Sequence, residues 1–278
     1  LRQNSLDESR KFSYSKEYEN PRDVKVSAAA EAAGLQRYLK RRTFAGKQRG
    51  TDMNLYDILG PVMVGPSSSH TAGAVRIGLI TRKLLGNAPT KADIALAGSF
   101  AATGRGHGTD RALAAGLLGM QPDDTRIPDS LQLAREQGME VRFREIQLKD
   151  AHPNTALLHV ETEDGRELEL QASSLGGGRI IVNKLDGIDV NFTGESPTLI
   201  VHNLDQPGHV AEVTSMLSHK SVNIATMQLY RNKRGGYAVM VLETDQPIPE
   251  DSVAWLAHLE GVIKVTYLNT VQENEHGV

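Results

Sequence analysis

Residues 198 to 219, TLIVHNLDQPGHVAEVTSMLSH, decide the fold of the second half of the chain. Thr198 to His202 is an apolar run of strand length, and Val210 to His219 has apolar residues at helical spacing. Between them Pro207 fixes φ, and Gly208 permits backbone conformations that other residues avoid. The stretch therefore predicts a strand, a tight turn and a helix in close succession.

The following sequence continues this alternation. Two strands, a helix and a last strand are expected at Ile224–Arg231, Tyr237–Glu243, Ser252–Leu259 and Val262–Leu268. The order βαββαβ is the ferredoxin-like split arrangement. We assign this domain to residues 197–270 and a short tail to residues 271–278.

Two motifs in this domain point to a family. The turn reads D-x-P-G-x-V-A from Asp205, and V-N-I-A follows from Val222. Together they resemble the ACT family of small regulatory domains. The resemblance implies self-association and amino-acid binding at an interface between paired domains. The residues it implicates are Gly208, His209, Asn223 and Ile224. The alternative is that the turn and Asn223 only shape loops and the domain only mediates dimerisation.

The preceding part, residues 53–194, predicts a mixed α/β domain. Helices are expected at Gly73–Leu85, Asp110–Leu118 and Pro128–Gly138, and strands at Asp93–Ala97, Glu140–Gln147, Thr155–Glu161, Glu167–Gln171 and Ile180–Leu185. Residues 1–52, in which Lys and Arg outnumber Asp and Glu, are expected to form a flexible N-terminal extension. The expected fold class is therefore α+β or α/β, in two domains.

The composition excludes several functions. A net charge of −3 gives no reason to expect nucleic acid or an anionic membrane as a partner. No apolar run approaches the roughly 18 residues of a membrane span, and no secretory signal opens the chain, so we expect a cytoplasmic protein. The sequence has no cysteine, which excludes disulfides and thiolate ligands on this chain.

A run of hydroxyls and one imidazole is the first candidate site. Ser67, Ser68, Ser69, His70 and Thr71 lie between two glycines and directly before a predicted helix. Free N–H groups at a helix start can hold a small anion, and His70 can change charge near neutral pH. Serine is also a common helix cap, so that a merely capped loop is the alternative.

A second run, Gly104 to Arg111, contains His107 and Asp110 before another predicted helix. These two residues are a candidate oriented His–carboxylate pair, and a capping Asp110 beside a solvated His107 is the alternative. The run lacks the lysine of a phosphate-binding loop. Two further runs, His152 to Thr155 with Asn154, and the loop Ser173 to Arg179, are not specific alone.

The combination of these runs is specific. M-V-G-P-S-S-S-H-T-A-G-A-V-R-I-G, then G-S-F-A-x-T-x-x-G-H-G-T-D-R-A-L, then H-P-N-T, then G-G-G and an ACT-like domain resemble the beta chain of bacterial iron–sulfur L-serine dehydratases. The likeness runs from about Met53 to about Thr270. The first domain is also similar to the allosteric substrate-binding domain of some phosphoglycerate dehydrogenases.

This resemblance implies an L-serine ammonia-lyase that forms pyruvate and ammonia in serine catabolism and gluconeogenesis. It implies a [4Fe–4S] cluster ligated by a partner alpha chain, with no metal ligand on this chain. Ser67, Ser68, Ser69 and Thr71 would hold L-serine, which is also a possible ACT ligand, and His70 would transfer the proton. His107, Asp110 and Asn154 would surround these residues without contacting the substrate themselves. The alternative is a non-catalytic subunit or module that senses amino acids.

Overall fold

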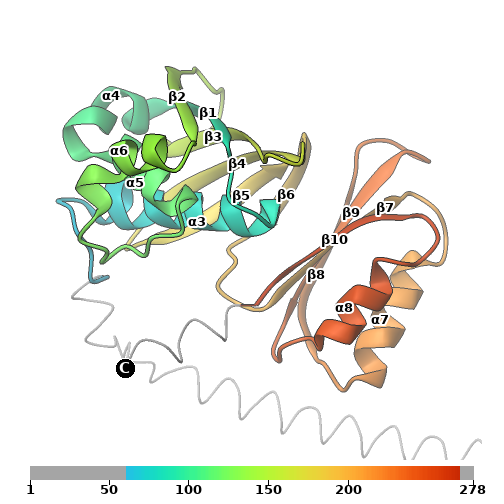
Figure 1. Ribbon diagram of the computed structural model, residues 1–278. Helices are drawn as coiled ribbons and strands as arrows, with labels where there is room; N and C mark the ends of the chain where they lie inside the picture. Colours follow the sequence, from blue (N-terminus) through green and yellow to red (C-terminus); the bar gives the residue numbers. More distant parts are fainter. Residues whose placement is uncertain (1–60, 270–278) are drawn as a thin grey trace, which may run out of the picture. The chain divides into compact units, whose positions relative to one another are not determined.

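The computed structural model describes residues 61–269 (Figure 1). The expected N-terminal extension at 1–52, the start of the first domain at Met53 and the tail at 271–278 lie outside the described residues. Within them, no helix is both long and apolar enough to cross a bilayer.

A six-stranded sheet forms the first domain. Its strands are β1 (Lys91–Leu96), β2 (Glu140–Glu145), β3 (Thr155–Glu161), β4 (Glu167–Gly176), β5 (Arg179–Leu185) and β6 (Ile188–Phe192). Their spatial order is β2-β1-β3-β4-β5-β6. Strands β1 and β2 run parallel, and the other neighbours run antiparallel. The expected mixed α/β architecture is confirmed.

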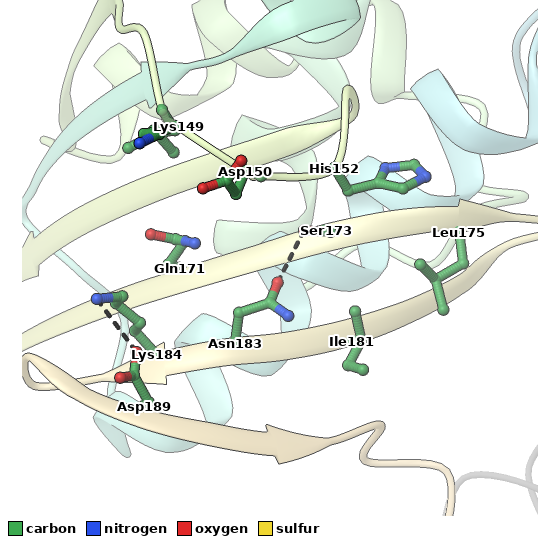
Figure 2. Close-up of a pocket in the computed structure, with 12 residues that line it drawn as sticks. Lys149, Asp150, His152, Gln171, Ser173, Leu175, Ile181, Asn183, Lys184 and Asp189 are labelled. Atoms are coloured by element: carbon green, nitrogen blue, oxygen red, sulfur yellow. Dashed lines mark hydrogen bonds and ion pairs between the residues drawn. The ribbon is translucent and has the colours of Figure 1, made fainter.

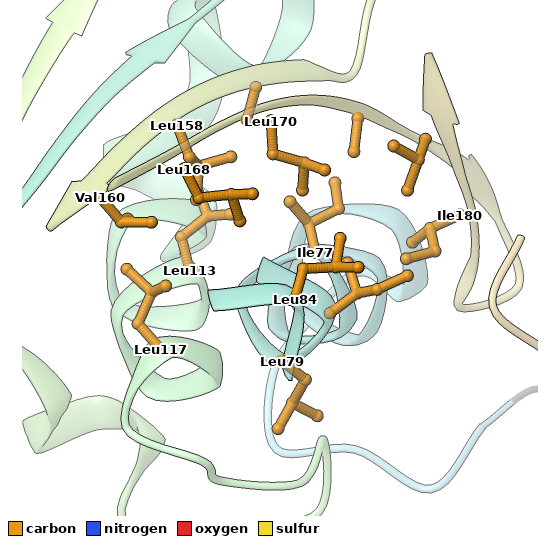
Figure 3. Close-up of a cluster of buried hydrophobic side chains, with 14 of the residues drawn as sticks. Ile77, Leu79, Leu84, Leu113, Leu117, Leu158, Val160, Leu168, Leu170 and Ile180 are labelled. Atoms are coloured by element: carbon orange, nitrogen blue, oxygen red, sulfur yellow. The ribbon is translucent and has the colours of Figure 1, made fainter. Parts of the chain in front are cut away.

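Helices pack on one face of this sheet. They are a π-helical turn (Ser68–Gly73), α3 (Ala74–Leu85), α4 (Gly98–His107), α5 (Thr109–Leu117) and α6 (Ser130–Glu136), the last preceded by a 3₁₀ turn. Apolar residues of α3 and α5, among them Ile77 and Leu113, meet Leu158, Leu168 and Leu170 of the sheet in a buried core (Figure 3). Alternate strand residues face this core, which leaves the others on the opposite face.

Two glycines let helices α3 and α5 approach closely. A Cβ at Gly78 would lie 2.4 Å from the carbonyl oxygen of Leu113, and one at Gly116 would lie 2.1 Å from that of Val75. Because no side chain fits at either position, the two backbones touch. The close contact fixes α3, and with it the Ser67–Gly73 turn, on the core.

The first domain differs from the sequence-based expectation in three elements. Residues 98–107 form α4 despite three glycines, because Phe100 is fully buried and anchors the segment. Strand β4 continues to Gly176, so the first half of the predicted loop Ser173 to Arg179 is strand. The edge strand β6 was not predicted: its residues alternate between apolar and polar as in a strand, but Asp189 and Asn191 are residue types that are depleted in strands.

The second domain has the predicted order βαββαβ. Its elements are β7 (Thr198–Leu204), α7 (His209–His219), β8 (Ile224–Arg231), β9 (Tyr237–Thr244), α8 (Glu250–Leu256) and β10 (Val262–Leu268). The sheet order β10-β7-β9-β8 is antiparallel throughout, and both helices cover one face (Figure 1). The ferredoxin-like arrangement expected of an ACT domain is confirmed.

Candidate active site

The serine-rich run forms the π-helical turn that opens α3. Ser67 caps it: its Oγ accepts from the His70 backbone N–H at 3.3 Å, and its carbonyl oxygen accepts from the Thr71 N–H at 2.8 Å. These two bonds use backbone donors that the sequence suggested as anion ligands. Among the residues that the structure describes, no partner is found for the N–H groups of Ser68 and Ser69, which are donors of the first turn.

The turn is pressed against strand β4. A Cβ at Gly73 would lie 2.0 Å from Ser174 Oγ, so only glycine fits there. The Gly177 N–H donates to Ser68 Oγ at 3.3 Å, which ties the turn to the loop between β4 and β5. The glycines on both sides of the run therefore serve close packing, and they place its hydroxyls beside those of β4.

His70 lies at the centre of this cluster, with 7% of its surface exposed. Its Nδ1 is 3.3 Å from Ser67 Oγ, and its Nε2 is 3.3 Å from Ser99 Oγ and 3.0 Å from Thr103 Oγ1. Its ring meets that of His107 edge to face at 5.0 Å. Burial and, to a smaller degree, the neighbouring His107 lower the pKa of His70, while a hydrogen bond to the Ser99 backbone opposes them. His70 is therefore held as a neutral base at neutral pH.

Several buried polar atoms near the turn have no hydrogen-bond partner among the described residues. They are Thr71 Oγ1, Ser174 Oγ and Asn154 Oδ1. The backbone N–H of Ser174 donates to the Asn154 carbonyl oxygen at 2.9 Å, so that these two residues are neighbours. Buried polar atoms are rarely left unpaired in folded proteins. These atoms are therefore candidate contacts for a small polar ligand.

In the first domain the structure brings several of the predicted site residues together, but it does not pair Asp110 with His107. Ser67, Ser69, His70 and His107 form one cluster through the contacts given above. Asp110 Oδ1 instead accepts from the Arg111 backbone N–H at 2.9 Å, at the start of α5. No His107–Asp110 contact occurs among the described residues, and Gly108 rather than Asp110 is the N-cap of α5.

Sequence reasoning missed the residues that contact His70 Nε2. Ser99 and Thr103 lie one turn apart on α4, a helix that the sequence did not predict. Ser174 was assigned to a loop, although it lies in β4. The hydroxyl spacing of four residues at positions 99 and 103 is the signal that points to one helix face.

A separate pocket of about 470 Å³ lies on the other face of the sheet (Figure 2). Gln171, Ser173 and Leu175 of β4 line it, alternating with residues that face the helices. Ser173 Oγ donates to Asn183 Oδ1 at 2.8 Å, and Lys184 pairs with Asp189 at 3.1 Å on its wall. His70 and the serine run do not line this pocket.

The four residues implicated in the ACT-like domain do not meet within one chain. Gly208, with φ of +111°, and His209 precede and open α7, whereas Asn223 and Ile224 follow its other end. Eleven residues of helix span about 16 Å. The buried His209 has no hydrogen-bond partner for either ring nitrogen among the described residues, although Nδ1 lies 3.5 Å from Glu212 Oε2.

Comparison with known proteins shows which family the chain resembles. The family described as serine dehydratase beta chain matches residues 54–185. The probable L-serine dehydratase beta chain of Bacillus subtilis is 41% identical, over 77% of this chain and 96% of its own length. The L-serine dehydratase beta chain of Peptoniphilus asaccharolyticus is 36% identical, over 78% of this chain and 99% of its own.

A solved ACT domain, from the GTP pyrophosphokinase of Chlorobium tepidum, matches 26% of this chain and 95% of its own length. It shares 20% sequence identity with this chain at a TM-score of 0.20. The family assignment rests on the two beta chains, each of which is matched over almost its whole length. The chain belongs to the L-serine dehydratase beta-chain family and is a serine dehydratase subunit.

Proposed function

We propose that this chain is the beta subunit of a two-chain L-serine ammonia-lyase, working with an alpha chain that holds a [4Fe–4S] cluster. The observation that carries the proposal is His70, buried and neutral among hydroxyls at the start of α3. A dehydratase needs a base for the Cα proton and groups that hold a carboxylate. The imidazole of His70 and the hydroxyls around it offer both.

The reaction removes the Cα proton and the β-hydroxyl of L-serine. The 2-aminoacrylate left behind tautomerises to an imine, and water converts the imine to pyruvate and ammonia. In our proposal His70 takes the proton, which is worth about 10²- to 10⁴-fold in rate for a positioned general base. The hydroxyls of Ser67, Ser68, Ser69 and Thr71, with the free N–H groups of the turn, hold the carboxylate.

The residues of this chain do not fit an iron–sulfur cluster. The sequence has no cysteine, and residues 61–269 contain no group of three His, Asp or Glu that could hold a metal. We therefore assign the cluster ligands to the alpha chain. Bound there, the cluster would supply a Lewis acid for departure of the β-hydroxyl. We also predict that the protein is located in the cytoplasm.

Replacing His70 in the reconstituted pair tests the catalytic role. We expect His70→Ala to lower the rate of pyruvate formation by about 10²-fold or more, because no other group takes the Cα proton. His159→Ala is the matched control, since His159 is an exposed histidine on β3. Wild-type turnover of a folded His70→Ala pair would exclude the catalytic role and favour the amino-acid-sensing alternative.

We further propose that two copies pair through their ACT-like domains and bind an amino acid, L-serine being the first candidate. The placement of Gly208 and His209 away from Asn223 and Ile224 supports a site shared by two copies. Calorimetric titration of the protein with L-serine, together with sedimentation equilibrium, tests this. Binding by a strictly monomeric protein would contradict a shared site.

A further inference from the structure

The hydroxyl of Thr103 can only act as an acceptor toward His70. Thr103 Oγ1 donates its single hydrogen to the Ser99 backbone carbonyl at 2.8 Å, one turn earlier in α4. The same oxygen lies 3.0 Å from His70 Nε2. A hydroxyl whose hydrogen is already used can only accept from a second neighbour. The hydrogen between Thr103 and His70 must therefore come from the imidazole.

The opposite protonation of Nε2 leaves a conflict. With no hydrogen on Nε2, that nitrogen and Thr103 Oγ1 would face each other as two acceptors at 3.0 Å. Ser99 Oγ, at 3.3 Å, would then be the only donor in reach of Nε2 among the described contacts. With the hydrogen on Nε2, both hydroxyl oxygens accept from it. A hydrogen on Nε2 therefore gives both of these contacts a donor and an acceptor.

The other ring nitrogen then carries the lone pair. A neutral imidazole with hydrogen on Nε2 is an acceptor at Nδ1. That atom lies 3.3 Å from Ser67 Oγ, which is itself 3.4 Å from Ser69 Oγ. The basic nitrogen therefore faces the serine run, and the protonated one faces α4.

Helix α4 is firmly placed for this task. The Ser99 N–H donates to the Pro153 carbonyl oxygen at 2.7 Å, and Gly98, with φ of +54°, passes so close to Pro153 that a Cβ would lie 2.6 Å from the same oxygen. Phe100 is fully buried and meets the His70 ring edge to face at 5.2 Å. Ser99 and Thr103 thus approach His70 from a fixed backbone.

We infer that Thr103 is a positioning residue, which holds neutral His70 with its hydrogen on Nε2 and so directs the basic Nδ1 toward Ser67 and Ser69. This inference deepens the proposed function and rests on it for its catalytic consequence. The orientation itself is a property of the folded chain and is measurable without turnover.

Nitrogen-15 NMR of the histidine rings in the full-length chain, at a pH where His70 is neutral, tests the orientation directly. The resonance that disappears in His70→Gln identifies the residue. We expect hydrogen on Nε2 in the wild type and in Thr103→Ser, and a mixture of both tautomers in Thr103→Val. Hydrogen on Nδ1 in the wild type, or an unchanged ring in Thr103→Val, would overturn the inference.

Kinetics of the reconstituted pair supply the second measurement. Thr103→Val should lower kcat about tenfold, which corresponds to about 1.4 kcal/mol, and leave KM nearly unchanged. Thr103→Ser should restore kcat. Thr214→Val is the control, because Thr214 Oγ1 makes the same bond one turn back in α7, to the Val210 carbonyl oxygen at 2.8 Å, and has no role in our catalytic proposal. Equal kcat for Thr103→Val and wild type would contradict a positioning role.

The orientation of His70 and the proposed function can be rejected independently. A wild-type pair that makes no pyruvate, together with hydrogen on Nε2 in the spectra, would reject the proposed function and support the assigned orientation. An active pair in which His70 carries its hydrogen on Nδ1 would reject the orientation alone.

Discussion

At the scale of single residues, the site depends on burying an imidazole without charging it. His70 is almost fully buried, and its polar neighbours are hydroxyls and a second imidazole. Hydroxyls can follow either protonation state of a ring, whereas a carboxylate would fix the charged one. This environment suits a base that must be neutral before it takes a proton.

The direction of the His70 pKa shift predicts the pH profile of the enzyme. Burial lowers this pKa, so the neutral base persists below the ordinary histidine value of about 6.5. The acid limb of kcat/KM should therefore lie below that pH. His107→Asn removes an imidazole whose electrostatic effect lowers the pKa of His70, so the pKa of His70 should rise and the limb should move to higher pH. A limb that stays in place or moves down would contradict this account.

The unpaired hydroxyl of Ser174 gives a second prediction. If it contacts the substrate, Ser174→Ala should raise the KM for L-serine about fivefold and leave thermal stability unchanged or higher, because a buried unpaired group is removed. Ser130→Ala is the opposite case. Ser130 Oγ donates to the Arg111 carbonyl at 2.7 Å, so its loss should lower stability and leave KM unchanged. An unchanged KM in Ser174→Ala would remove Ser174 from the site.

At the scale of elements, the crossing of α3 and α5 holds the Ser67–Gly73 turn in place. Gly116→Ala puts a methyl group 2.1 Å from the Val75 carbonyl oxygen, so the helices must separate. We expect a loss of about 1–3 kcal/mol in the free energy of unfolding, measured by urea denaturation. Gly106→Ala is the matched control: nothing lies within 4 Å of its new Cβ, and stability should rise by up to about 1 kcal/mol. Equal effects of the two substitutions would refute the close crossing.

The elements also show what the sequence can predict. The second domain was predicted element by element, because its apolar periods are regular and its turns carry glycine or proline. Helix α4 was missed, since Gly104 and Gly106 lower its intrinsic helicity and burial of Phe100 offsets this only in the folded domain. The serine run and His70 were recognisable locally. Their contacts with Thr103 and Ser174 depend on tertiary packing and were not.

At the scale of the whole molecule, the proposed function needs more than this one chain. In our proposal the chain provides a base and hydroxyls, and its sequence contains no cysteine. The four ACT-like residues lie at opposite ends of α7, so the proposed ligand site would be incomplete in one copy. Both features lead to the same expectation, that this chain works only in an assembly.

Anaerobic assay of pyruvate formation from L-serine, with this chain alone, with the cysteine-bearing partner alone and with both together, tests that claim most directly. We predict turnover only when both chains are present, and its loss when iron is removed from the pair. Pyruvate formation by this chain alone, without iron and without a partner, would contradict the account.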